Sequence, residues 1–458
     1  MRSIVGGYWS NGASCGSRYL NNNTVGTLNS NYGARAASDM WAGIYKASSQ
    51  PTAGHTGHAR RAKYKTGVWR QLVAGWRTLS PDIMKRHGNL YDKIISKENL
   101  KEAHRIARKG KTKKASVRWV DENLDKCIDE LHDSLARGEY RTSNYVTKTV
   151  FEPKERLIYI VPYYPDRILQ HAVMNVLEPI WDKLFTYHSY ACRKGKGQHK
   201  GSSECMRHVR RYKYCLKCDC SKFYYSVNHR RIKEIIRKKI KCDRTLRLID
   251  EIIDSVNRMN YFFLLCMVVF MRRWELEMWF IVEAALTVAG QCEHNVPIGN
   301  FLSQWCGNLY LNELDTMIKH KFKVKAYLRY CDDFLLFSDD KDFLNRMKHE
   351  VKNFLLDDLH LKMSKIELFP VTRGVDFLGY RHFPNGYILA RKSTAKRMKK
   401  HTKGIMHNLK HGDITKETAV SMISSAQGWL KWANTHNLQQ SMKLSTLKEE
   451  VLAYEEIQ

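Results

Sequence analysis

The sequence predicts a mixed α/β (α+β) fold of two or three domains, and three observations support this prediction. The chain has 458 residues, which is enough for more than one hydrophobic core. Short apolar runs typical of buried strands occur at 157–161, at 214–219 and on both sides of residues 332–333. Longer segments with one apolar stripe, typical of amphipathic helices, precede and follow these runs.

Residues 1–83 differ from the rest of the chain. They are rich in Gly, Asn and Ser and show no sustained helical or strand period, so we expect this segment to be poorly ordered by itself. From Met84 the pattern changes to long basic helical segments. One of them places a single apolar stripe along a helix, formed by Leu124, Cys127, Ile128, Leu131 and Leu135. A folded domain is therefore predicted to begin near residue 84.

A basic run at 105–114 precedes that helix, and it is either a solvated face or a phosphate contact. A strand at 157–161 ends at Pro162, and 167–180 is predicted to be a helix. We expect residues 194–201 to form a flexible basic loop. Their glycine spacing is not that of a dinucleotide-binding loop, and no repeated strand and helix surround them.

The strand predicted at 214–219 contains cysteines at a metal-like spacing: Cys215, Cys218 and Cys220. No second pair follows at zinc-ribbon spacing, so buried strand cysteines are the better interpretation. The chain has 12 cysteines, and its N-terminus shows no charged region followed by an apolar stretch. We therefore expect reduced thiols and a cytoplasmic protein.

Two further segments complete the domain organisation. The run 261–271 is wholly apolar, but its eleven residues are too few to span a bilayer, so 257–294 is interpreted as an inserted segment that is buried or contacts a partner, and no membrane association is expected. After Gly379 the chain returns to basic helical patterns. A helical C-terminal domain is predicted over 390–458.

The charge balance indicates the class of partner. Lys and Arg number 77 against 46 Asp and Glu, a formal net charge of +31. An excess of this size favours a polyanion, because neutralising phosphates releases their counterions. Nucleic acid is the first candidate.

The most informative segment is Tyr330-Cys331-Asp332-Asp333, which lies between two apolar runs. These runs predict two strands, so the paired carboxylates should lie at the turn of a β-hairpin. A solvated turn is the alternative, but the apolar flanks favour a Mg²⁺ site. Asp219, at the end of another strand, supplies a third carboxylate. Two Mg²⁺ ions held by such ligands perform the nucleotidyl transfer of a polymerase.

At these residues the sequence resembles the reverse transcriptase family, from about Met84 to the C-terminus. Residues 330–333 resemble its Tyr-x-Asp-Asp motif, 219–224 its first metal-binding motif, and Gly379 within 377–380 its primer-grip region. The resemblance implies a right-hand polymerase, with fingers and palm over 84–389 and a helical thumb over 390–458. It also implies an RNA-directed DNA polymerase, a nucleotidyltransferase that acts on template RNA, a cDNA primer and dNTPs.

Within the family, the segment from Val296 to Gln304 is similar to that of the reverse transcriptases of diversity-generating retroelements. Ile298 precedes Gly299, and the motif ends in Ser303-Gln304 where most relatives have Ser-Pro. This resemblance implies error-prone copying at adenines, mutagenic retrohoming and a basic accessory RNA-binding protein. Residues 1–83 resemble a translated template repeat and spacer, with 84–91 as the usual start of such an enzyme. A genuine flexible N-terminal arm is the alternative.

Other readings stay open at this point. The chain resembles bacterial reverse transcriptases of the group II intron, retron and phage-defence types as well. The absence of an obvious endonuclease module after the thumb weakens the intron reading. From a different class, a catalytically silent RNA-binding scaffold is the alternative, against which the three aspartates argue.

The resemblance assigns roles to individual residues. Metal ligation falls to Asp219, Asp332 and Asp333, with the Cys220 carbonyl as a further ligand. Lys365 is the expected general acid for leaving pyrophosphate, or a plain surface lysine. Tyr224 is the expected discriminator against the ribose 2′-hydroxyl, or a core aromatic. The other expected substrate-binding residues are Arg156, Arg193 and Lys194 on the triphosphate, and Gly299 and Gln304 at the templating base.

Overall fold

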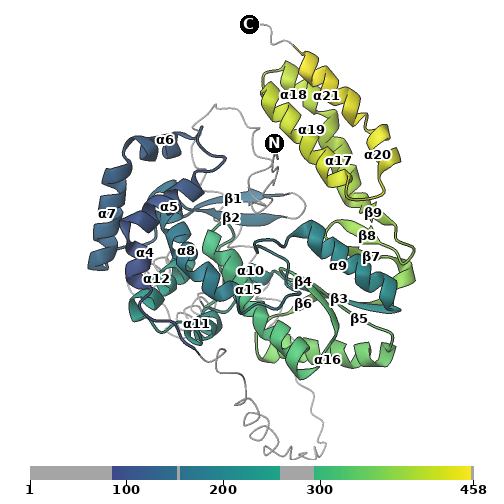
Figure 1. Cartoon of the computed structure of the whole chain (residues 1–458), viewed down its shortest axis with the longest axis horizontal. Coiled ribbons are helices and arrows are strands. Elements are labelled where there is room, and N and C mark those ends of the chain that lie inside the picture. The colour runs from purple at the N-terminus through teal and green to yellow at the C-terminus, as the bar shows by residue number, and fades with distance from the viewer. Residues whose placement is uncertain (1–84, 152–154, 258–292, 455–458) are drawn as a thin grey trace, which may run out of the picture. The chain divides into compact units, whose positions relative to one another are not determined.

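The structure is a computed structural model that describes residues 85–151, 155–257 and 293–454 (Figure 1). The expected N-terminal extension over 1–83 and the apolar run at 261–271 lie outside the described residues. In the part of the chain that is described, no helix is both long and apolar enough to cross a membrane.

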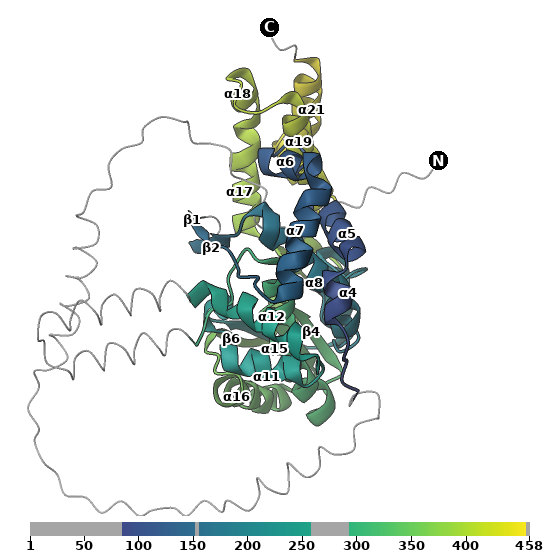
Figure 2. The same cartoon turned by 90° about the vertical axis from the view of Figure 1, so that its left-hand side faces the viewer.

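The first part of the described chain is helical, and these helices face the viewer in Figure 2. The predicted amphipathic helix is confirmed, because Cys127, Ile128 and Leu131 are buried on one face of α7. Ser96 begins α5 by accepting a hydrogen bond from the Asn99 backbone, and Gly138 ends α7 in a left-handed conformation. The elements are α4 (Tyr91–Ile95), α5 (Lys97–Ala107), α6 (Ala115–Glu122), α7 (Leu124–Arg137) and α8 (Ile168–Asp182).

A two-stranded antiparallel ribbon separates α7 from α8. It consists of β1 (Val146–Val150) and β2 (Arg156–Ile160), with Val150 opposite Arg156. The strand predicted at 157–161 is thus confirmed, shifted by one residue. Every residue of β1 is exposed, and the backbone of β2 is anchored by Tyr159, whose N–H donates to the Ile298 carbonyl at 2.7 Å.

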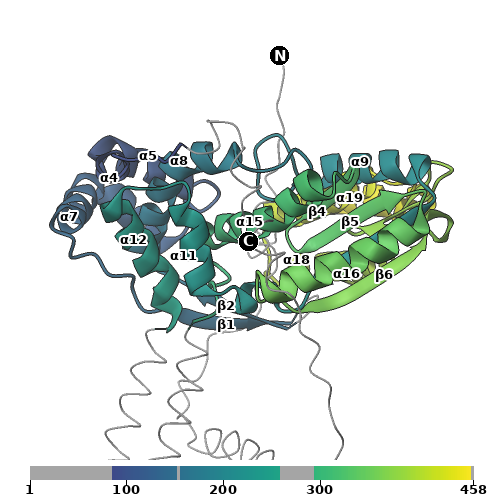
Figure 3. The ribbon, with the colours of Figure 1, turned by 90° about the horizontal axis from the view of Figure 1, so that it is seen from below.

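The central sheet has four antiparallel strands in the order β4-β5-β3-β6 (Figure 3). Because side chains alternate along a strand, each strand contributes to two cores. Leu216, Phe334 and Leu336 pack on one side, and Cys215 and Leu335 pack on the other. The strands are β3 (Tyr214–Cys220), β4 (Ala326–Tyr330), β5 (Asp333–Ser338) and β6 (Met363–Pro370).

Helices cover both faces of this sheet. Buried residues of α15 and α16 join the core that contains Leu216, whereas Cys205 and Val209 of α9 join the core that contains Cys215. The expected loop at 194–201 is corrected in its second half, because α9 begins at Gln198. The helices of this region are α9 (Gln198–Arg211), α10 (Phe223–Ser226), α11 (His229–Arg237), α12 (Asp243–Asp254), α15 (Phe301–Thr316) and α16 (Lys341–Asp357).

A small antiparallel sheet follows, formed by β7 (Val375–Phe377), β8 (Tyr380–His382) and β9 (Ile388–Ala390). The expectation that basic helix begins directly after Gly379 is therefore wrong, because two short strands intervene. Val375 and Phe377 are buried in the same core as α9. These strands place the turn that contains Gly379 beside α9, since Gln198 Nε2 donates to the Leu378 carbonyl at 2.7 Å.

The last described residues, 392–453, are helical. Ile405, Ala419 and Val451 belong to a separate small core. The ring of Trp429 stacks on that of Tyr380 with 4.4 Å between centroids, so this helical part is attached to β8. The helices are α17 (Lys392–Lys403), α18 (Ile405–Lys410), α19 (Lys416–Leu430), α20 (His436–Ser441) and α21 (Leu444–Ala453).

Candidate active site

The register of the central sheet brings the predicted carboxylates to one end of it. Asp219 of β3 lies directly opposite Asp333 of β5, and Tyr330 of β4 lies opposite the same Asp333. The turn between β4 and β5 contains Cys331, in a left-handed conformation, and Asp332. The prediction of a β-hairpin with the paired aspartates at its turn is confirmed.

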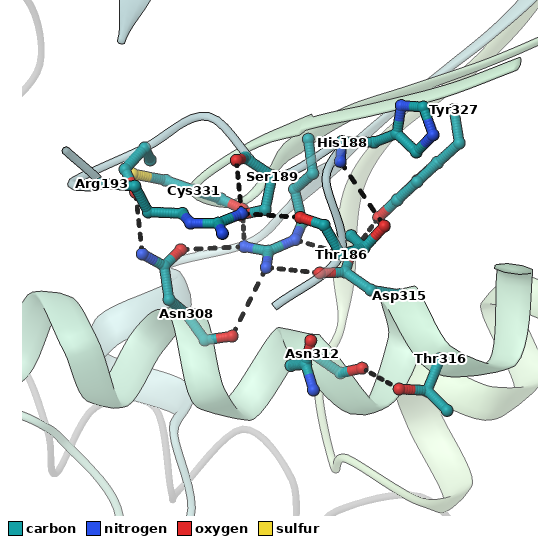
Figure 4. A network of polar contacts seen from close by, with 12 residues as sticks. Thr186, His188, Ser189, Arg193, Asn308, Asn312, Asp315, Thr316, Tyr327 and Cys331 are labelled. Carbon is teal, nitrogen blue, oxygen red and sulfur yellow. Dashed lines mark hydrogen bonds and ion pairs between the residues drawn. The ribbon is translucent and has the colours of Figure 1, made fainter. Parts of the chain in front are cut away.

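A buried ion pair between Arg329 and Asp315 supports this turn, and Figure 4 shows Asp315 and Asn308 of α15 together with Cys331 of the turn. Arg329 donates from Nε and Nη2 to the two carboxylate oxygens of Asp315 at 2.7 and 2.6 Å. Its Nη1 donates to the Cys331 carbonyl and to Asn308 Oδ1, both at 3.1 Å. The Tyr327 hydroxyl donates to Asp315 at 2.6 Å. The carbonyl that joins Cys331 to Asp332 is therefore fixed by a guanidinium that is itself held on α15.

The same network includes the segment that precedes α9. Arg329 N–H donates to the His188 carbonyl and its own carbonyl accepts from Tyr190, each at 2.9 Å. Asn308 Nδ2 donates to the Ala191 carbonyl at 2.9 Å. Sequence reasoning did not select Arg329. The signal was present, because an arginine stands inside an otherwise apolar strand, and such a residue needs a buried partner.

Burial and mutual repulsion set the electrostatics of the aspartates. Burial, and then the charge of Asp219, raises the pKa of Asp332 to about 6. Burial also raises the pKa of Asp333 to about 6, with Lys217 opposing the shift. The Lys217 ammonium lies 3.5 Å from Asp333 Oδ2 and donates to the Asp376 carbonyl. This lysine, two residues before Asp219, was also missed from the sequence.

The donor chemistry of the site fits a divalent cation. Three carboxylates supply hard oxygen ligands, and Asp333 Oδ1 is buried with no hydrogen-bond partner among the described residues. In the described ranges no three Asp, Glu, His or Cys side chains are gathered so as to hold a metal ion, and Asp219 Oδ2 instead accepts from Ser364 Oγ at 2.6 Å. A cation would compensate the buried charge and the repulsion from Asp219, which together raise the pKa of Asp332 and Asp333.

Cys220 can serve such a site only through its backbone. Its side chain is 3% exposed and belongs to the core under the sheet, and burial raises the pKa of its thiol well above the usual range. Cys215 and Cys218 are buried as well, and all three are free thiols. The interpretation of this trio as buried strand cysteines is confirmed.

Tyr224 lies close to the turn that contains Cys331 and Asp332. Burial and then the neighbouring Cys331 raise the pKa of its phenol well above the usual range, with Cys192 and Asp332 acting in the same direction. A Cβ placed on Gly307 of α15 would lie 3.3 Å from the Tyr224 ring. The aromatic ring is thus held between the turn and α15.

Gly299 and Gln304 lie at the start of α15. Gly299 has a φ of +125°, and a Cβ there would collide with the Tyr159 carbonyl of β2, so only glycine fits. Gln304 Oε1 accepts from Cys192 Sγ at 3.4 Å. The segment before α15 therefore packs against the β1–β2 ribbon, and Gln304 faces the segment that precedes α9.

Of the four basic candidates, three have exposed or half-exposed side chains and one, Arg193, is largely buried. Arg156 is exposed at the start of β2, near enough to Asp332 for its charge to oppose the rise in the pKa of that carboxyl. Lys365 lies opposite Asp219 in the sheet, half exposed, with its ammonium 3.2 Å from Glu367 Oε1. Lys194 is exposed, 3.1 Å from Glu178.

The structure corrects the role expected for Arg193. Its guanidinium donates to the Asp182 carboxylate at 2.6 Å and to the carbonyls of Asp182, Thr186 and Ser189. A side chain that is 9% exposed and donates four hydrogen bonds inside the protein is not available to a triphosphate. Arg193 instead holds together the segment between α8 and α9.

Comparisons with known proteins identify a matching family. The family model described as reverse transcriptase (RNA-dependent DNA polymerase) matches residues 148–382, from β1 to β8. Protein YkfC of Escherichia coli (strain K12) is 24% identical over 293 residues, which is 55% of this chain and 70% of YkfC. The group II intron-encoded protein LtrA of Lactococcus lactis subsp. cremoris is 22% identical over 318 residues, or 67% of this chain. The match spans only 48% of LtrA.

Among solved structures, this chain is similar to an apo telomerase from Candida tropicalis that is truncated from its C-terminal domain. The TM-score is 0.37 and the sequence identity is 13%. The similarity covers 54% of this chain and 55% of that chain. The family match includes most of the β1–β2 ribbon, which carries Arg156, and the whole four-stranded sheet, which carries Asp219 and Asp333.

Proposed function

The chain belongs to the reverse transcriptase family of RNA-directed DNA polymerases, and from this membership we propose that it synthesises cDNA on an RNA template by two-metal nucleotidyl transfer. The fold is that of a right-hand polymerase, whose central sheet is the palm. The observation that carries the proposal is the register of this sheet, which sets Asp219 opposite Asp333 beside Asp332.

Each candidate residue has a task in this chemistry. Asp219, Asp332 and Asp333, with the Cys220 carbonyl, would hold two Mg²⁺ ions, which when bound supply charge stabilisation for the reacting phosphates. Tyr224 lies under the sugar of the incoming nucleotide and excludes its 2′-hydroxyl. Arg156 and Lys194 bind the triphosphate, and Lys365 donates a proton to the pyrophosphate that leaves.

The finer proposal is that this enzyme copies the template repeat of a diversity-generating retroelement with errors at adenines. The segment from Ile298 to Gln304 supports it by resemblance. Template RNA, primer, dNTPs and a basic accessory RNA-binding protein are the proposed partners. A group II intron-type reverse transcriptase is the second candidate, favoured by the similarity to LtrA.

Primer extension on an RNA template with Mg²⁺ tests the reaction. We expect wild-type chain to extend the primer and Asp332→Ala with Asp333→Ala to lose extension entirely, because two of the three carboxylate ligands are gone. Asp357→Ala with Asp358→Ala is the matched control, since this adjacent pair is exposed at the end of α16. Polymerisation by the catalytic double variant would show that the metal assignment is wrong.

Sequencing the cDNA tests the finer proposal. Substitutions concentrated opposite template adenines are expected for a diversity-generating enzyme. An even distribution over the four template bases would exclude this reading and leave the group II intron type as the better one.

A further inference from the structure

A second concentration of positive charge lies at the end of the palm sheet away from the aspartates. Six residues separate Lys213 from Asp219 along β3, a distance of about 20 Å in an extended strand. The cations at this far end are all exposed, and we call them the arginine surface: Arg210, Arg211, Lys213, Arg373 and Arg381.

Backbone contacts and close packing bring these residues together from three parts of the chain. The Lys213 carbonyl accepts from Val371 N–H at 2.9 Å, which joins the start of β3 to the end of β6. The Arg381 guanidinium donates to the Arg373 carbonyl. The Arg210 guanidinium lies against Gly386, in the connection between β8 and β9, where a Cβ would collide with it. The surface is therefore built by packing and does not depend on freely moving side chains.

Three of the arginines stand over aromatic rings. The guanidinium carbon of Arg211 lies 5.5 Å from the centroid of Tyr212. The same distance is 5.5 Å for Arg373 over Phe369 and 5.4 Å for Arg381 over Phe383. A guanidinium held on a ring is fixed in orientation, and the N–H donors that it does not use inside the protein can match a phosphate group.

Carboxylates do not balance this charge. Within the described residues none of the five cations forms an ion pair, and the neighbouring pairs Arg207–Glu204 and Arg391–Asp376 use other side chains. Asp339 marks the edge of the surface, where its Oδ1 accepts from Lys213 N–H at 2.9 Å. Five like charges gathered around one acidic residue repel one another, and a polyanion would remove that repulsion.

The location separates this surface from the polymerase cleft. The β7–β8 hairpin has its turn, at Leu378 and Gly379, at the end that resembles the primer grip. Arg381 and Arg373 lie toward its other end, where Val375 pairs with His382. A template–primer held at Asp219 and at this turn would therefore leave the arginine surface uncovered.

We propose that the arginine surface binds folded RNA outside the copied segment, through its phosphates and by stacking of its bases on the guanidinium planes. The proposal rests on the proposed function, because it assigns to the same RNA a second attachment to the enzyme. RNA fits better than an acidic protein, because four of the five cations are arginines and three of these are set on rings, a pattern suited to phosphate and base stacking. Such an attachment would hold the template RNA while its copied part moves through the cleft.

The test compares two substrates with the full chain. One is a short template–primer with a few unpaired template nucleotides, and the other carries in addition an RNA hairpin beyond them. Binding is measured at several salt concentrations for wild type and for Arg210→Gln with Arg373→Gln and Arg381→Gln. We expect wild type to bind the hairpin substrate more tightly, and the triple variant to lose about tenfold on it alone. Its salt slope should fall by about 2 to 3, because each phosphate contact contributes about 0.7 to 0.9.

Two matched variants keep the result interpretable. Lys341→Gln with Arg346→Gln and Lys352→Gln removes the same charge from exposed positions of α16 and should retain wild-type binding. Replacing Arg210, Arg373 and Arg381 by lysine keeps their charge, so this variant should recover most of the salt slope that the glutamine variant loses. A loss caused by misfolding would not be recovered by restoring charge alone. Primer extension on the short substrate reports separately on the proposed function.

Three results would overturn the proposal. One is equal binding of the hairpin substrate by wild type and the glutamine triple variant. Another is an equal loss in the α16 control. The third is displacement of the hairpin by poly-glutamate at the same charge concentration, which would assign the surface to acidic proteins.

Discussion

Arg329 and Asp315 form a bidentate ion pair, and their side chains are 0% and 1% exposed. Arg329 lies three residues before Asp332, the first of the paired aspartates. The charges cannot be hydrated, so each depends on the other. The Cys331 carbonyl takes part in the same network through Arg329 Nη1. One arginine therefore joins the buried carboxylate of α15 to the backbone of the turn between β4 and β5.

Removing one partner of this pair should destabilise the chain strongly. We expect Asp315→Leu to lower the free energy of unfolding by about 3–5 kcal/mol, because Arg329 is left buried with its charge uncompensated. Arg329→Met together with Asp315→Leu should recover most of this loss in urea unfolding. The control is Arg346→Met, whose partner Asp340 is exposed at 3.9 Å, and it should change stability by less than about 1 kcal/mol. A double variant as unstable as Asp315→Leu alone would contradict this account.

The raised pKa values of Asp332 and Asp333 predict a pH-dependent stability. Both rise from 3.8 to about 6 on folding, so the folded chain binds more protons than the unfolded chain between these values. Stability from these groups is therefore present at about pH 4 and is lost as pH rises through about 6. In a chelator, Asp332→Asn with Asp333→Asn should be more stable than wild type at pH 7 and equal to it near pH 4. Thermal unfolding across this pH range measures the sign of the stability difference. Asp357→Asn with Asp358→Asn should show no difference from wild type that grows between about pH 4 and pH 7.

Divalent cation binding should follow the same carboxylates. Because ligands must be deprotonated, we expect the apparent affinity for Mg²⁺ to rise between about pH 5 and pH 7. The readout is the rise in unfolding temperature that Mg²⁺ causes at each pH, which needs no substrate. The catalytic Asn double variant should lose this rise. A Mg²⁺ effect of equal size in the variant would place the cation elsewhere.

Gly299 should tolerate no side chain. Gly299→Ala puts a Cβ into the Tyr159 carbonyl at a φ of +125°, so the start of α15 must move away from β2. We expect primer extension to fall by at least about tenfold, which corresponds to about 1.4 kcal/mol. Gly138→Ala is the control, because its φ is +74° but nothing lies within 4 Å of the added atom. That variant should cost about 1 kcal/mol of stability at most and leave extension unchanged.

Tyr224 should govern the choice of sugar. Tyr224→Ala is expected to raise ribonucleotide incorporation relative to deoxyribonucleotide incorporation by at least about tenfold, because the ring that meets the 2′-hydroxyl is removed. The ratio of kcat/KM for the two nucleotides measures this. A variant that loses activity on both nucleotides without changing the ratio would show that Tyr224 is a core aromatic only.

The strands that carry the candidate aspartates were predictable because the sequence patterns that indicate them are local. The apolar runs around Asp332 and the strand before Asp219 gave the hairpin and the third carboxylate, since alternation and turn residues act over a few positions. Long-range partners were not predictable. Arg193 looked like a free cation because nothing in the sequence shows that it donates to Asp182. The three-residue strands β8 and β9 were missed, because so short a run carries too little pattern.

Three residues of helix α15 contact three different parts of the candidate site. Gln304 lies in its first turn, Gly307 packs beside Tyr224, and Asp315 holds Arg329 near its end. The 11 residues from Gln304 to Asp315 span about 16 Å of helix. A displacement of this helix would disturb the contacts of Gln304 with Cys192, of Gly307 with Tyr224 and of Asp315 with Arg329 together. Exchange of one side chain on α15 can therefore act on one of these contacts alone, whereas a movement of the helix cannot.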